Sequence, residues 1–319
     1  MKAIIQDGYG SPDVFKLAEM PRPVVKDNDV LVRAMAASIN AGDVFTMRGN
    51  PWLTRLMVGF PKPKKYIPGW DLAGVVEAVG PGVTQFHPGD EVFTSCGRTM
   101  AEYVSVAEEK LALIPTNLTF EQAAAVPDAA ITALQGLRDA GKVQPGQKVL
   151  INGASGGVGT FAVQIAKVLG AEVTGVCSAR NVDMVRSLGA DVVVDYTRED
   201  FTQNGRRYDL ILDNVANHSF SEMMNVLSPQ GRIVPNSGYG GMGYVLKAFL
   251  LSPFSRQLEN MYLAAPNGKD LVLLKEWIEA GKLKPVIDRT YPLSDTPEAF
   301  RCLENEHARG KVVITISCL

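Results

Sequence analysis

The sequence predicts an α/β protein built from a small β-rich barrel and a doubly wound parallel sheet. Three observations support this prediction. Short apolar runs separated by turn signals fill residues 1 to about 118, strand and helix patterns alternate from about 119 to 265, and a strand pattern returns at 311–316. Short strands with frequent turns are typical of a barrel, whereas strands that alternate with helices are typical of a parallel sheet.

Length and composition agree with two globular domains and exclude several other classes. The chain has 319 residues, of which 46% are apolar and 21% are charged. About 150 residues per domain is the usual prior, so two domains fit this length. The formal net charge of −2 argues against broad electrostatic capture of nucleic acid, and we expect no nucleic-acid partner. The longest apolar stretch, 244–251, contains Lys247 and is too short to span a membrane.

The cysteines indicate a reducing compartment. Cys96, Cys177, Cys302 and Cys318 are scattered and form no C-x-x-C pair. The N-terminal apolar run is interrupted by Asp7-Gly8, too early for a signal peptide. We therefore expect a cytoplasmic protein with free thiols.

The first region supplies the strands of the barrel. Residues 29–35 alternate apolar and polar side chains, as a half-buried strand does. Further strand patterns cover 72–79, 91–94 and 101–106, and the turn signals are Gly80-Pro81-Gly82 and Pro88-Gly89-Asp90.

The sequence pattern changes from strands to helices near residue 119, where Thr119 and Gln122 form a capping-box pattern. An Ala-rich helix, interrupted at Pro127, leads to Gly141. A helix at 158–169 then lies among strands expected at 148–152, 172–177, 191–196, 208–213 and 232–236. After about 266 we expect a helix at 271–280, a loop, and a last strand at 311–316. This strand has no βαβ partner in the sequence pattern, so we expect it to return to the first domain and close its barrel.

A glycine-rich turn between a strand and a helix is the sharpest motif. It follows strand 148–152 and opens helix 158–169, which is the arrangement that binds dinucleotides. Glycine allows the tight turn and the close approach of backbone to a pyrophosphate, and the free N–H groups of the helix start favour the phosphate charge. Residue 154 is alanine where the strict pattern has glycine. The predicted cofactor-binding residues are Gly153, Ala154, Ser155, Gly156, Gly157, Val158 and Gly159.

The end of the next strand favours NADP(H) over NAD(H). An NAD site usually has Asp or Glu there to accept from the ribose 2′-hydroxyl, but this sequence reads Val176-Cys-Ser-Ala-Arg180. Ser178 can donate a hydrogen bond and Arg180 can pair with a 2′-phosphate. Tyr196, at the end of the third strand, is placed on the adenosine side. The alternative for Arg180 is a solvated residue at a helix start.

Several segments together resemble a known family. They are 67–80 (IPGWDLAGVVEAVG), 88–92 (PGDEV) and 153–159, supported by 38–43, 188–191 and 310–313. The chain resembles the zinc-independent quinone oxidoreductase branch of the medium-chain dehydrogenase/reductase superfamily, most of all the chloroplast-envelope quinone oxidoreductase homologues. The resemblance implies a GroES-like barrel domain formed by 1–121 and 266–319, and a Rossmann domain formed by 122–265.

The resemblance also implies a site without zinc. Zinc alcohol dehydrogenases of this superfamily use a cysteine and a His-Glu pair, and here Asn40 and Trp70-Asp71 stand in those positions. A catalytic zinc needs about three His, Cys or carboxylate ligands. The histidines, His87, His218 and His307, are dispersed along the chain. We predict no metal.

Without a Lewis acid, reduction of an activated acceptor is the favoured chemistry. A quinone or an α,β-unsaturated carbonyl accepts hydride directly from NADPH, and the protein positions the acceptor and stabilises the oxyanion. Asn40 is the first candidate for holding the substrate carbonyl, and Asp43 for orienting its loop. The alternative for Asn40 is a turn residue that bonds to its own backbone.

Further candidates for the cofactor site lie at strand ends and on the Ala-rich helix. Thr132 resembles the family's threonine near the nicotinamide, its alternative being a helix residue bonded to its own turn. Asn214, Ser237 and Gly238 end two strands of the parallel sheet, where ligands bind in such folds.

Other functions and contacts stay open. The chain is alternatively a non-catalytic NADPH-binding sensor or structural protein, or an NAD(P)-dependent alcohol dehydrogenase. The resemblance to this family is compatible with a homodimer or a monomer, so the oligomeric state stays open. Lys62, Lys64 and Lys65 form a solvated loop or meet anionic substrate or lipid. Residues 239–254 form a wall over the substrate, a dimer contact, a weak membrane contact or a buried core helix.

Overall fold

A computed structural model describes residues 1–319 except 53, 65, 238–239, 306–307 and 317–319. The chain folds into two compact units. Unit 1 comprises Met1–Ile131 and Pro266–Leu319, and unit 2 comprises Thr132–Ala265. Residues 122–131 fall in unit 1, where helix α3 (Phe120–Ala124) packs against strands β3 and β4.

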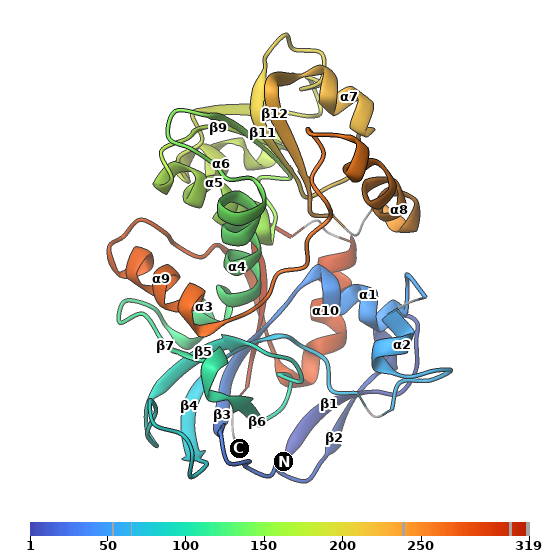
Figure 1. Cartoon of the computed structure of the whole chain (residues 1–319). Coiled ribbons are helices and arrows are strands. Elements are labelled where there is room, and N and C mark those ends of the chain that lie inside the picture. The colour runs from blue at the N-terminus through green and yellow to red at the C-terminus, as the bar shows by residue number, and fades with distance from the viewer. Residues whose placement is uncertain (53, 65, 238–239, 306–307, 317–319) are drawn as a thin grey trace. The chain divides into compact units, whose positions relative to one another are not determined.

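A mixed sheet of strands from both ends of the chain is the frame of unit 1 (Figure 1). Within the described residues its order is β13-β14-β3-β4-β5-β7, and β6 pairs with β3. Its strands are β3 (Asp29–Ile39), β4 (Asp71–Val79), β5 (Glu91–Ser95), β6 (Tyr103–Ala107), β7 (Ala112–Leu113), β13 (Ile287–Pro292) and β14 (Lys311–Thr315). A separate antiparallel ribbon consists of β1 (Lys2–Gln6) and β2 (Phe15–Glu19).

The return of the last strand to the first domain is confirmed. Strand β14 runs antiparallel to β3, so that the blue and red ends of the colour scale meet in unit 1 (Figure 1). In the registers of this sheet, Ser38 of β3 lies opposite Asp71 of β4 and opposite Val313 of β14. These registers bring the first residues of β4 and β14 to the end of β3.

The expectation of a loop before the last strand, and of no βαβ partner for it, is wrong. Strand β13 runs parallel to β14, and helix α10 (Thr296–Asn305) connects them. Helix α10 buries Ala299, Phe300 and Cys302, and the Phe300 ring lies 4.5 Å from that of Phe15. The other helices of unit 1 are α1 (Ala41–Arg48), α2 (Thr54–Val58) and α9 (Gly268–Glu279), and α4 (Pro127–Gln135) begins there.

Unit 2 has the predicted alternation of strands and helices around a parallel sheet. The strand order is β10-β9-β8-β11-β12. The strands are β8 (Lys148–Asn152), β9 (Glu172–Cys177), β10 (Val192–Asp195), β11 (Tyr208–Asp213) and β12 (Leu227–Pro235), and the helices are α5 (Gly157–Val168), α6 (Val182–Ser187), α7 (Phe220–Asn225) and α8 (Gly241–Leu251).

The strand order of unit 2 reverses at β8, and this reversal fixes where a ligand binds. Right-handed crossovers place α5 and α6 on one side of the sheet and α7 on the other, as Figure 1 shows. Ligands of such sheets bind outside the carboxyl ends of the strands at the point of reversal, here next to β8 and β11.

Helix α8 is not the buried core helix that the sequence left open. Its Leu246, Phe249 and Leu250 are exposed, whereas Ala248 is buried. No described helix is both long enough and apolar enough to span a membrane.

Candidate functional site

The turn between β8 and α5 is shaped by backbone contacts that only glycine allows. Gly153 has a φ of +79°. A Cβ on Gly159 would lie 2.0 Å from the carbonyl oxygen of Gly153, whereas one on Gly156 would meet nothing closer than 3.7 Å. Glycine at position 159 therefore lets the helix start pack directly against the backbone of Gly153, whereas Gly156 leaves room for a ligand to approach the backbone.

Alanine at position 154 is accommodated because its side chain faces the protein interior. Ala154 is fully buried, and its N–H donates to the carbonyl of Val176 at 2.9 Å. The neighbouring strand provides the room, since a Cβ on Gly175 would lie 3.0 Å from that of Ala154. The departure from the strict glycine pattern thus lies on the side of the turn away from a ligand.

The start of α5 fits a pyrophosphate. Its N-cap is Gly156, and no side chain caps the helix. The N–H groups of a first helical turn point outward and carry partial positive charge, which attracts phosphate. Backbone groups of Gly157, Val158 and Gly159, with Ser155 in the preceding turn, would hold the pyrophosphate of a dinucleotide.

The predicted adenosine-side residues lie together at one corner of the sheet. Ser178 is half-buried at the end of β9, and Arg180 is exposed on the 3-10 turn that follows. The N–H of Tyr196 donates to the carbonyl of Cys177 at 3.0 Å, which places this exposed tyrosine beside the same turn.

Sequence reasoning missed a carboxylate at this corner. Asp195 ends β10 rather than β9, and its Oδ1 accepts from the N–H and the hydroxyl of Thr197 at 3.0 and 2.8 Å. These hydrogen bonds hold the pKa of Asp195 below its usual value. Asp195 therefore holds the turn that contains Thr197, beside the corner with Ser178 and Arg180.

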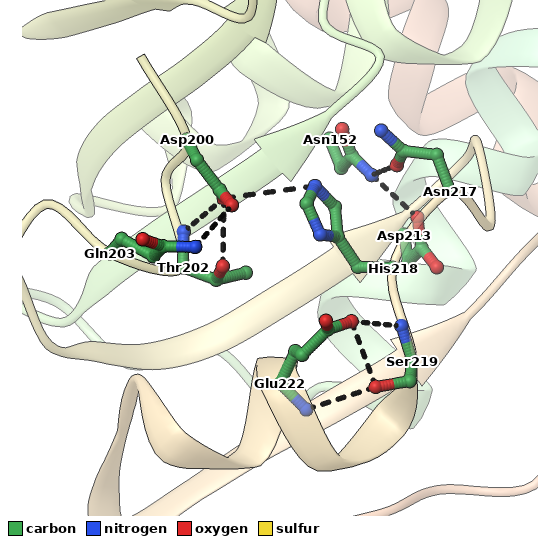
Figure 2. Close-up of polar contacts among 9 residues, drawn as sticks. All are labelled: Asn152, Asp200, Thr202, Gln203, Asp213, Asn217, His218, Ser219 and Glu222. Carbon is green, nitrogen blue, oxygen red and sulfur yellow. Dashed lines mark hydrogen bonds and ion pairs between the residues drawn. The ribbon is translucent and has the colours of Figure 1, made fainter.

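A second missed carboxylate, Asp213, organises the end of β11 (Figure 2). Its Oδ1 accepts from the amide of Asn152 at 2.8 Å, and the same amide donates to Asn217 (Figure 2). The hydroxyl of Tyr244 donates to Oδ2 at 2.6 Å, and the pKa of Tyr244 is raised by burial and by this carboxylate. The fully buried carboxylate thus fixes the loop after β11, where Ala216 has a φ of +61°.

The predicted nicotinamide-side residues differ in how they are held. The Asn214 amide donates to the carbonyl of Asn152 at 3.0 Å and accepts from Asn236 at 2.6 Å, so it braces the sheet end. Ser237 is buried. Gly238 lies outside the described residues.

Thr132 lies on helix α4 and is half-buried. Its carbonyl accepts from the Tyr262 hydroxyl. Among the described residues its own hydroxyl has no hydrogen-bond partner, so it does not bond to its own turn.

Unit 1 contains a buried polar cluster of Ser38, Asn40, Asp43, Asp71 and Lys311, here called the Lys311 cluster. Asp71 Oδ2 accepts from Ser38 at 2.8 Å, from the Asn40 amide at 2.9 Å and from Lys311 Nζ at 3.1 Å. Lys311 also donates to Asn40 Oδ1. The side chains of Lys311 and Asp71 are 2% and 0% exposed, so this ion pair is fully removed from solvent.

The two predicted substrate-side residues belong to this cluster. Asn40 is the N-cap residue of α1 and forms a capping box with Asp43, and its side chain also joins β4 and β14. Asp43 accepts from the N–H of Asn40 at 2.9 Å and from that of Gly69 at 3.1 Å. Burial is the main cause that raises the pKa of Asp43 to about 7. Asp43 therefore ties the start of α1 to the segment before β4.

The sequence did not single out Lys311 and Asp71 as partners, although a signal was present. Each is a charged residue that opens a strand and is followed by three buried residues, 72–74 in β4 and 312–314 in β14. A charge at such a position needs a partner, and pairing the two would have located the cluster.

The described residues do not fit a zinc ion. They contain no group of three His, Cys, Asp or Glu side chains arranged to hold a metal. Asn40 and Asp71 both bind the ammonium of Lys311, which is itself a cation. His218 instead faces Asp200 at 3.9 Å (Figure 2), and His307 lies outside the described residues.

Comparison with known proteins agrees with both units. Residues 26–136 match the family model "Alcohol dehydrogenase GroES-like domain", and residues 188–314 match "Zinc-binding dehydrogenase". The chain is 34% identical to the NADPH-dependent alkenal/one oxidoreductase of Arabidopsis thaliana, covering 98% of this chain and 79% of that protein. It is 33% identical to the chloroplast envelope quinone oxidoreductase homolog of the same plant, covering 98% of both.

Solved structures give the same result. The quinone oxidoreductase from Coxiella burnetii superposes with a TM-score of 0.90 at 31% identity, covering 99% of each chain. The chain therefore belongs to the quinone oxidoreductase branch of the medium-chain dehydrogenase/reductase superfamily.

Proposed function

We propose that this protein is an NADPH-dependent, zinc-independent reductase of quinones or α,β-unsaturated carbonyls. The observation that carries the proposal is the open glycine turn at the start of α5, in a chain whose relatives are an alkenal/one and a quinone oxidoreductase. The Lys311 cluster supports zinc independence, because an ammonium binds Asn40 and Asp71, the residues at the positions where the zinc relatives have ligands.

The residues of each unit have separate tasks in this reaction. A bound NADPH supplies the hydride. In unit 2, the turn from Gly153 to Gly159 holds the pyrophosphate, and Asn214 and Asp213 fix the strand ends beside it. In unit 1, Asn40 and Asp43 act as positioning residues, because they shape the start of α1 and are themselves buried.

An acceptor panel tests the proposal directly. Purified protein is mixed with NADPH and a quinone, an enone, a saturated aldehyde or a saturated ketone, and the loss of NADPH absorbance is followed. We expect turnover of the quinone and the enone and none of the saturated carbonyls. Tight NADPH binding without turnover of any acceptor would instead support a sensor, and alcohol oxidation with NAD would support an alcohol dehydrogenase.

Cofactor selectivity is tested by Arg180→Ala. Loss of a charged hydrogen bond to the 2′-phosphate costs about 1.5–3 kcal/mol, which corresponds to a Kd for NADPH raised roughly 10- to 150-fold. The Kd for NADH should stay unchanged, because NADH lacks that phosphate. Arg186→Ala, which removes an exposed arginine on the next helix, is the matched control. Equal weakening of NADPH and NADH by Arg180→Ala would contradict the assignment.

A further inference from the structure

Helix α4 has one narrow half-buried face, and Asp128 begins it. Within Pro127–Gln135 only Asp128, Thr132 and Gln135 are half-buried, while the other residues are buried. These positions follow the i, i+4, i+7 spacing of a single helix face. The Asp128 carboxyl therefore lies one turn from the hydroxyl of Thr132, the residue assigned to the nicotinamide side.

The backbone of Asp128 is fixed while its carboxyl is uncommitted. Its N–H donates to Asp71 Oδ1 at 2.8 Å, and the other oxygen of Asp71 is held by the Lys311 cluster. In the described part of the chain, no group donates a hydrogen bond to the Asp128 carboxyl or forms an ion pair with it. A carboxyl on a half-buried residue at a rigid helix start, without a hydrogen-bond or ion-pair partner among the described residues, is suited to act on a bound molecule.

Charged groups on three elements surround this carboxyl: Asp71 on β4, Asp43 on α1 and Lys311 on β14. Burial first and Asp71 second raise the pKa of Asp128 to about 7, against the opposing effect of Lys311. The group therefore carries a proton in a large share of the molecules at neutral pH, and an acid whose pKa is near the working pH is the most effective proton donor.

We propose that Asp128 is the general acid of the reduction and protonates the α-carbon of an enone substrate, an inference that rests on the proposed function. The β-carbon receives the hydride and forms a C–H bond, and the electron pair of the C=C bond shifts toward the carbonyl to give an enolate. The α-carbon of the enolate then takes the proton of Asp128, whose O–H electron pair remains on the carboxylate. The products are the saturated ketone and NADP⁺, and water restores the proton on Asp128.

The test compares the wild type with Asp128→Asn, using 2-methylcyclohex-2-enone and benzoquinone as probes. Wild-type kcat for the enone should be highest below pH 7 and fall above it, as the carboxyl loses its proton. Asp128→Asn should lower this kcat about 100-fold and flatten the pH profile. Benzoquinone reduction should change little, since its oxygen anion takes a proton from water. The wild type should give one enantiomer of 2-methylcyclohexanone in excess, and Asp128→Asn a nearly racemic product.

A second readout needs no turnover. Infrared titration of the free protein should show carboxylic acid absorption that disappears near pH 7 in the wild type, and Asp128→Asn should lack the part that belongs to Asp128. The band of Asp43 remains in Asp128→Asn and should disappear at a lower pH than in the wild type, because the charge of Asp128 contributes to the raised pKa of Asp43. Asp139→Asn, which alters an exposed carboxylate paired with Arg138, should keep the band, the pH profile and the product ratio. Asp128→Glu retains an acid and should keep the falling profile.

The outcomes separate the two proposals. If the wild type reduces the enone and Asp128→Asn has the same pH profile, product ratio and infrared titration, Asp128 is not the acid while the reductase function stands. If the wild type reduces neither probe, the proposed function fails and the role of Asp128 fails with it.

Discussion

Lys311→Met is expected to lower the free energy of unfolding by about 3–5 kcal/mol, which is the usual cost of removing one member of a buried ion pair. The ammonium is 2% exposed and neutralises Asp71, which is 0% exposed. Methionine keeps most of the apolar stem. Among the described residues, the buried Asp71 carboxylate then keeps only neutral donors, which are Ser38, Asn40 and the N–H of Asp128. Urea unfolding followed by circular dichroism measures the loss.

Two controls identify the cause as the uncompensated charge. In Lys311→Met with Asp71→Asn the charge is gone from both sides, so more than half of the lost stability should return. Lys16→Met removes a lysine whose ion pair with Asp7 has a similar length, 2.8 Å, but is mostly exposed, and it should lower the free energy of unfolding far less than Lys311→Met does. A double variant as unstable as Lys311→Met alone would show that the lysine stem, not its charge, stabilises the unit.

Gly159→Ala and Gly156→Ala are expected to separate folding of the phosphate turn from its use. A methyl group on Gly159 would lie 2.0 Å from a backbone oxygen, so the turn must distort. We expect a loss of about 2 kcal/mol in stability and more than about 100-fold in NADPH affinity. Gly156 has an ordinary φ of −82°, and a Cβ there would make only an ordinary contact of 3.7 Å with the carbonyl oxygen of Gly153, so Gly156→Ala should fold normally.

NADPH binding by Gly156→Ala, the variant that we expect to fold normally, is the measurement that tests the phosphate site. A methyl group on Gly156 stands where the pyrophosphate approaches the helix start, and it should raise the Kd for NADPH at least about 10-fold. Thermal melts followed by circular dichroism report the folding of both variants, and calorimetric titration reports binding. NADPH binding by Gly156→Ala as tight as that of the wild type would place the pyrophosphate elsewhere.

Strands β8, β9 and β11 of the parallel sheet were predictable because most of their residues are apolar and buried. The predicted bounds of β8, β9 and β11 equal those of the structure. Strand β13 was missed for the opposite reason. Strand β13 reads Ile-Asp-Arg-Thr-Tyr-Pro and is half-exposed along its length, so no apolar pattern marked it.

The cofactor turn was readable from local sequence, whereas the Lys311 cluster was not. Residues 148–159 contain a strand, its glycines and the start of the helix in one continuous segment, so their spacing alone indicates a phosphate site. Asn40, Asp71 and Lys311 are brought together by strand registers between distant parts of the chain. Spacing along a sequence carries no information about such registers, and only the pairing of buried charges would have indicated them.

The position of β14 in the sheet also determines the order in which the two units become complete during synthesis. Residues 132–265 form unit 2 without interruption, so every strand of its sheet has been translated before residue 266 is added. Strand β3 is made early but gains its neighbour β14, with Lys311, only after all of unit 2 has been translated. Asp71 and Lys311 are 240 residues apart in the sequence. The carboxylate of Asp71 is therefore without its ion-pair partner until about that many further residues have been translated. Unit 2 is thus the first unit whose residues are all available for folding.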